Sequence, residues 1–169
     1  MQALITILLG LVLTSDLYGW SAQASSTPVP RPPCVLRVTV LGQEVTMEFV
    51  IPLGDLVGFD RKPQGDREND LVDKRLADLA QTYGVVEFPR KAECSGRRSD
   101  VTPTFEKVHS GVAVKQVYFC KNIAAVNSLE MILFLKLRHL RSIQVRAETP
   151  NGNYEALLTP AWPRLSLEK

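Results

Sequence analysis

Alternation of apolar and polar residues defines the first structural unit of this chain. Apolar side chains recur at every second position over residues 36–40 and again over residues 45–51, and Gly42-Gln43 interrupts the alternation. Successive side chains of a strand point to opposite faces of a sheet, so this pattern is typical of half-buried strands. We therefore predict two strands joined by a tight turn, a β-hairpin.

The apolar spacing changes to three and four residues from Asp66 on. The positions that fall on one helical face are Val72, Leu76, Leu79 and Tyr83. Acidic and basic residues occupy the other faces, as in a helix that lies on the surface of a domain. The pattern predicts an amphipathic helix that begins at Asp66 and ends at Gly84.

A second helix is predicted over the strongly apolar residues 129–140. Asn127 with Glu130 three residues later forms a start similar to a capping box. A stretch of about a dozen residues is too short to cross a bilayer, which requires about 20. We therefore interpret it as a helix of the core.

Further strands are predicted between and after the helices. Residues 85–88 make a short strand, residues 89–100 a loop or irregular edge, and residues 112–120, apolar on both faces, an interior strand. Residues 143–159 make a second hairpin around the turn signal Pro150–Asn153. The prediction is an α+β fold of antiparallel β-hairpins with two amphipathic helices packed on the sheet. Because a hairpin with a helix occurs twice, an arrangement in two related lobes is the alternative.

The N-terminal region has the organisation of a signal peptide. A short apolar core is followed by Ala22-Gln23-Ala24, an A-x-A cleavage signal, so we expect residues 1–24 to be removed on export to the bacterial periplasm. Residues 25–33, rich in Ser, Thr and Pro, predict an extended tether, and residues 34–169 the folded domain. We expect no membrane span in the mature protein.

The charge balance excludes some partner classes. Without residues 1–24, which contain Asp16, 20 basic and 17 acidic side chains remain, a formal charge of +3. This excess is too small to indicate nucleic-acid or membrane binding. The middle of the chain is more basic, which favours either an acidic partner or a solvated surface; its basic residues are Arg61, Lys62, Arg90, Lys91, Arg97 and Arg98.

Three cysteines follow the predicted cleavage point, in a compartment where disulfides persist. We pair Cys94 with Cys120, because Cys34 adjoins the proline-rich tether, which we expect to hold it only weakly. Three alternatives then remain for Cys34: it is unpaired, it forms a disulfide with another molecule, or it binds a metal as its thiolate.

Residues for catalysis are scarce. The chain has two histidines, His109 and His139, and it lacks a nucleophile elbow, a phosphate-binding glycine loop and an H-E-x-x-H pattern. His139 falls near the end of the second predicted helix, where a solvated histidine is the simplest interpretation. His109 falls in a loop before the interior strand, where it is either solvated or part of a site. We do not expect an enzyme.

Several short motifs in order resemble the ZrgA family of periplasmic proteins linked to bacterial zinc uptake. They are Pro52-Leu-Gly-Asp-Leu-Val-Gly-Phe-Asp60, Glu87-Phe-Pro89, Ala92-Glu-Cys94, His109 and Phe119-Cys120. The resemblance extends over nearly all of the predicted mature chain. It implies a protein that captures Zn²⁺ outside the inner membrane and serves a zinc-import system of that membrane.

The chain departs from the family pattern at the expected ligands. Arg61 stands where the family has a histidine, Val29–Pro32 replaces an H-x-H pair, and the histidine-rich segment is absent. An arginine does not ligate zinc, so the remaining candidates are His109, Asp60 and Cys34. The alternative is a periplasmic structural or interaction module that has kept the fold without the metal.

Overall fold

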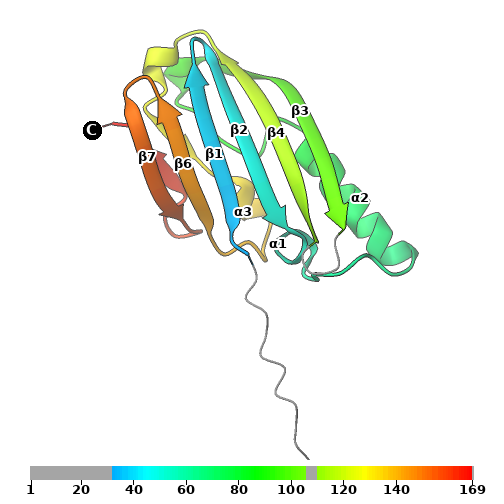
Figure 1. Cartoon of the computed structure of the whole chain (residues 1–169). Helices are drawn as coiled ribbons and strands as arrows, with labels where there is room; N and C mark the ends of the chain where they lie inside the picture. Colours follow the sequence, from blue (N-terminus) through cyan, green and yellow to red (C-terminus); the bar gives the residue numbers. More distant parts are fainter. Residues whose placement is uncertain (1–31, 106–109, 169) are drawn as a thin grey trace, which may run out of the picture.

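One six-stranded sheet dominates the structure, a computed structural model that describes residues 32–105 and 110–168 (Figure 1). The strand order is β3-β4-β2-β1-β6-β7. Neighbouring strands are antiparallel except β1 and β6, which are parallel. The bounds are β1 Cys34–Leu41, β2 Glu44–Pro52, β3 Cys94–Phe105, β4 Ser110–Cys120, β6 Ile143–Thr149 and β7 Gly152–Leu158.

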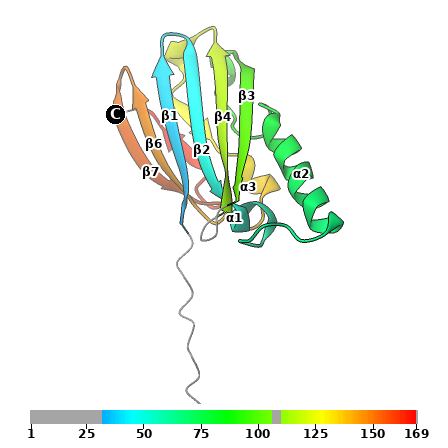
Figure 2. The ribbon, with the colours of Figure 1, turned by 45° about the vertical axis from the view of Figure 1, so that its right-hand side comes forward.

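The other elements gather on one face of this sheet and leave the opposite face open (Figures 1 and 2). They are the helices α1 Leu53–Val57, α2 Asp66–Ala80 and α3 Leu133–Lys136, the 3₁₀ turns η1 Arg90–Ala92 and η2 Ile123–Ala125, and the ladder of β5 Ser128–Glu130 with β8 Arg164–Ser166. The predicted α+β fold is confirmed. Both predicted hairpins belong to one continuous sheet and form no separate lobes.

The strands predicted from alternation are present. The hairpin of β1 and β2 turns at Gly42, which has φ +59°, and the hairpin of β6 and β7 turns at Pro150 and Asn151. Positions 34, 36, 38 and 40 of β1 are buried, whereas 35, 37 and 41 are exposed. The period of two therefore sorts the strand residues between the core and the open face.

The end of α2 is fixed by side chains of the sheet. Nε2 of Gln116, on β4, donates to the carbonyl oxygens of Leu79 and Gln81 at 2.9 and 3.1 Å. The hydroxyl of Tyr118 lies 2.7 Å from Thr82 O and 2.6 Å from Oε1 of Gln116, and its single proton is donated to one of these two acceptors at a time. Burial raises the pKa of Tyr118, so its hydroxyl stays protonated and donates. These bonds satisfy carbonyls that a helix end leaves without partners.

The helix consequently ends earlier than its apolar spacing predicts. It stops at Ala80, not Gly84, and Gln81 already has extended backbone angles. Tyr83, which we assigned to the buried helical face, is 72% exposed. Because Gln116 binds the carbonyls of Leu79 and Gln81 from outside the helix, tertiary contacts overrule the local periodicity.

The predicted second helix over residues 129–140 is wrong, because only α3 is helical there. The backbone N–H groups of Glu130, Met131 and Leu133 donate to Glu87 O, Pro163 O and Val85 O, partners on other segments. The predicted strand 85–88 is reduced to the single bridge between Glu87 and Glu130. Long-range pairing thus takes the donors that an α-helix would use internally.

Residues 89–100 were predicted to be a loop or an irregular edge, and from Cys94 on the second alternative is correct. From Cys94 the chain forms β3, an edge strand of 12 residues with a bulge between Gly96 and Arg98. Its composition of Gly, Pro, Arg and Ser hides the strand, and these residue types are the ones that edge strands tolerate.

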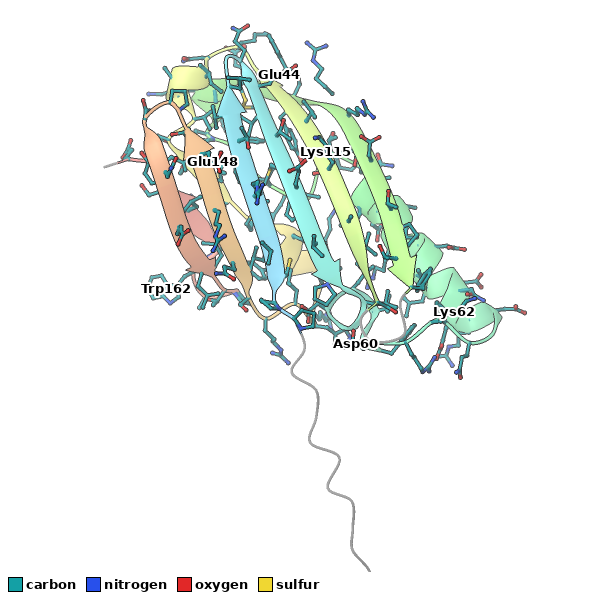
Figure 3. The ribbon with its side chains drawn as sticks, in the orientation of Figure 1. Glu44, Asp60, Lys62, Lys115, Glu148 and Trp162 are labelled. Atoms are coloured by element: carbon teal, nitrogen blue, oxygen red, sulfur yellow. A yellow bond between two sulfur atoms is a disulfide. The ribbon has the colours of Figure 1, made fainter. Side chains whose placement is uncertain are left out.

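A row of charged side chains crosses the open face in register. From β3 to β7 it consists of Asp100, Lys115, Glu48, Arg37, Arg146 and Glu155. Lys115, labelled in Figure 3, lies 2.9 Å from Glu48, and Arg146 lies 3.2 Å from Glu155. The row combines three acidic and three basic residues, so it carries no net charge.

The disulfide between Cys94 and Cys120 is confirmed and joins β3 to β4 across directly paired positions. Cys34 is the free cysteine, but not because it is loosely held. It opens β1, pairs in register with Ile143 and is 0% exposed. The pairing prediction was therefore right, whereas its reason was wrong.

We expect one reactive thiol in the unfolded protein and none in the folded one. Because Cys34 is buried, a thiol reagent should react slowly in buffer and should titrate one group in denaturant without reductant. Cys34→Ser should abolish that group. Three thiols in the unreduced wild type would contradict the disulfide.

Gln116→Leu should destabilise the fold by about 2 kcal/mol, because it leaves buried carbonyls at the end of α2 without a donor. Urea unfolding with the disulfide intact measures the loss. Gln43→Leu is the matched control, since Gln43 makes a single exposed bond to Lys121 O, and should cost less than about 0.5 kcal/mol. Equal losses would contradict the role of Gln116.

Candidate functional site

The motif Pro52–Asp60 folds into a compact turn at one end of the sheet. Pro52 ends β2, and all residues of α1 are buried. Gly58 terminates α1 with φ +92°, and its N–H donates to Gly54 O at 3.0 Å. Oδ1 of Asp60 accepts the N–H of Gly54 at 2.9 Å, so this carboxylate helps to fix the turn.

His139 lies against this turn. It belongs to the connection between α3 and β6, not to a helix end as the sequence suggested, and its side chain is exposed. A Cβ added at Gly58 would lie 3.0 Å from Nε2 of His139 and 3.2 Å from its Cε1. The positive φ of Gly58 favours glycine there, and a side chain at this position would also displace the exposed imidazole by a few tenths of an ångström. No local pattern in the sequence predicts this contact, which joins residues far apart in the chain.

Cys34, at the start of β1, lies on the interior side of the turn, near Asp55 of α1. Burial, and secondarily the charge of Asp55, raise the pKa of the Cys34 thiol to about 12. The thiol is therefore protonated in the metal-free protein, and zinc would have to displace its proton to bind the thiolate. Cys34 is also 0% exposed and belongs to no group of three or more possible metal ligands among the described residues. Asp55 is 8% exposed, and an acidic residue between the apolar positions 53, 56 and 57 was the signal in the sequence for a buried carboxylate.

Arg61, which stands where the resemblance leads us to expect a histidine, takes part in an ion pair. Its Nη1 and Nη2 lie 2.6 and 2.7 Å from the two carboxylate oxygens of Glu68 on α2. The guanidinium also lies 5.0 Å from the centre of the Phe59 ring. The backbone N–H of Gln64 donates to Glu68 at 2.7 Å. Arg61 therefore fastens the loop between α1 and α2 to the start of α2.

The predicted ligands do not assemble into a metal site in the part of the chain that the structure describes. No group of three or more His, Cys, Asp or Glu side chains within residues 32–105 and 110–168 could hold a metal ion. Asp60 and Cys34 both adjoin α1, but Asp60 is exposed and Cys34 is buried. His109 lies outside the described residues, as do residues 1–31, with the predicted signal peptide and most of the tether.

The basic residues of the middle of the chain do not form one surface. Lys62 lies beside the motif turn, at the opposite end of the sheet from Glu44 (Figure 3). Arg97 and Arg98 belong to the start of β3, near the Glu44 end, where Arg97 lies over the Phe119 ring. Two separate groups of cations therefore exist, each partly engaged by neighbours.

Comparisons with known proteins identify a family. The model of the family described as "ZrgA family zinc uptake protein" matches residues 34–167. None of the curated proteins matches the chain. Within the described ranges, no helix combines the length and the apolar character that crossing a membrane requires.

The ion pair between Arg61 and Glu68 predicts a specific pH dependence. Hydrogen bonds from Arg61, then from Gln64, lower the pKa of Glu68 to about 2. A lowered pKa in the folded state contributes stability above the unfolded pKa of about 4.3, and this is lost as pH falls toward 2. In Arg61→Ala, carboxyl ¹³C NMR should show the pKa of Glu68 returning toward its ordinary value. An unchanged pKa of Glu68 in Arg61→Ala would contradict the ion pair.

Proposed function

Because the chain belongs to the ZrgA family of zinc uptake proteins, with residues 34–167 matching, we propose that it binds Zn²⁺ in the periplasm and hands it to an import system of the inner membrane. The family match is the observation that carries this proposal. The segment 1–24 would direct export. The activity would be binding and transfer of a metal ion, without catalytic turnover.

The turn at Pro52–Asp60 is the proposed place of zinc binding. Asp60 supplies an exposed carboxylate there, and His139 supplies an imidazole against Gly58. Imidazole and carboxylate are both ordinary zinc ligands. His109, from the segment before β4, is the third candidate. Zinc is the cargo of this site, so moderate affinity and open coordination positions suit its release.

A second candidate function has its own support. Arg61, a cation that does not ligate zinc, stands where the resemblance leads us to expect a histidine, and it is paired with Glu68. The described residues contain no group of three or more possible metal ligands. Both observations favour an interaction module that has kept the fold without the metal. The two functions differ in whether zinc stabilises the native state.

Thermal unfolding of the chelator-stripped protein, with and without zinc, tests the proposal. A ligand that binds only the native state stabilises it by about 2.7 kcal/mol at a free concentration of 100 times Kd. We expect a rise of several degrees in the melting temperature. His109→Ala and His139→Ala should each reduce this rise, whereas Arg138→Ala, at the exposed neighbour of His139, should not.

The variant Arg61→His separates the two functions. It restores the family residue, so it should strengthen zinc binding if the site is active. If zinc leaves the wild type unchanged but stabilises Arg61→His, the interaction module is favoured and zinc binding by this chain is refuted. If neither protein responds, the turn is not a zinc site.

A further inference from the structure

A cleft lies where the turn of the β6–β7 hairpin approaches η2. Both elements stand at the same end of the sheet (Figures 1 and 2). Two adjoining cavities of about 310 and 240 Å³ share their lining at Ala124, Val126, Asn151 and Leu167. The shared residues make them one cleft, and the motif turn contributes nothing to it.

The two ends of the cleft differ in chemistry. One end is lined by apolar side chains, among them Val40 and Ile123. The other end is lined by Asn127, Tyr154 and Glu168. Glu168 is the one charged residue among the described residues that line either cavity. The apolar end of the cleft therefore suits the apolar body of a ligand, and the end with Glu168 suits a cationic group.

Hydrogen bonds position Asn127 and Glu168 at the polar end of the cleft. Nδ2 of Asn127 donates to Oε1 of Glu168 at 2.8 Å, and the carbonyl of Asn127 accepts the N–H of Leu167 at 2.8 Å. Among the described residues, Glu168 forms no ion pair. The hydroxyl of Tyr154 is buried and has no hydrogen-bond partner among them. A buried hydroxyl without a partner is costly, and a carboxylate and a hydroxyl are both acceptors.

We propose that this cleft binds a small ligand that carries a primary ammonium group on an apolar body. The apolar body lies against Val40 and Ile123, and the ammonium donates to the carboxylate of Glu168, on the side of the cleft that Tyr154 lines. A cavity of this size with a few convergent polar groups is the usual form of a small-molecule site. The site is independent of zinc handling, because it shares no residue with the motif turn.

Tryptamine is the probe, and indole-3-propionate is the matched control with a carboxylate in place of the ammonium. In titrations of the ¹⁵N-labelled protein followed by NMR, tryptamine should shift the amide signals of residues 123–127 and 149–154. Indole-3-propionate should bind at least tenfold more weakly, because Glu168 repels its carboxylate. No shifts in these segments up to 10 mM tryptamine, a concentration of weak fragment binding, would overturn the proposal.

Two variants locate the ligand. Glu168→Gln, at the exposed end of the chain, should remove the preference for tryptamine over indole-3-propionate. Ala124→Trp fills the cleft from an exposed position and should abolish the shifts, while the rest of the amide spectrum shows that the fold is retained. Unchanged preference in Glu168→Gln, or unchanged binding in Ala124→Trp, would refute this site.

Discussion

The parallel pairing of β1 with β6 is the constraint on which the rest of the structure depends. It joins the four antiparallel strands formed by residues before 121 to the hairpin formed after residue 142, and it makes one sheet of them. Because Cys34 pairs with Ile143, the chain that leads into β6 must pass the start of β1. The connection that carries His139 is thereby brought to the turn that ends β2. A contact between residues 58 and 139 exists only because two distant strands share a register.

Local pattern was sufficient where strands alternate regularly and turns carry glycine or asparagine. Both hairpins follow from period two, since one face is buried and the other solvated, whereas the interior strand was predicted from its apolar residues on both faces. The pattern failed at residues 129–140, whose apolar side chains suit a helix and a buried irregular segment equally well. The hydrogen bonds that decide between them come from Val85, Glu87 and Pro163, and no local pattern contains that information.

The candidate site was predicted in part. The motif Pro52–Asp60 does form a special turn, and Asp60 takes part in it. Cys34 was selected for its chemistry, but it is buried, whereas Asp60 lies on the exposed side of the turn. His139 was set aside because a helix was expected there. The error in the second helix thus became an error in the site, because the predicted position of His139 depended on the predicted helix.

The charged row across the open face also decides how copies of this protein meet. Consider two copies stacked face to face about a twofold axis parallel to the strands, between β1 and β2. Asp100 would oppose Glu155 and Lys115 would oppose Arg146, and only Glu48 and Arg37 in the centre would bring unlike charges together. An axis along the row would set every charge against its own copy. Since like charges directly opposite are unfavourable, the order of the charges disfavours both stackings even though the row is neutral in sum.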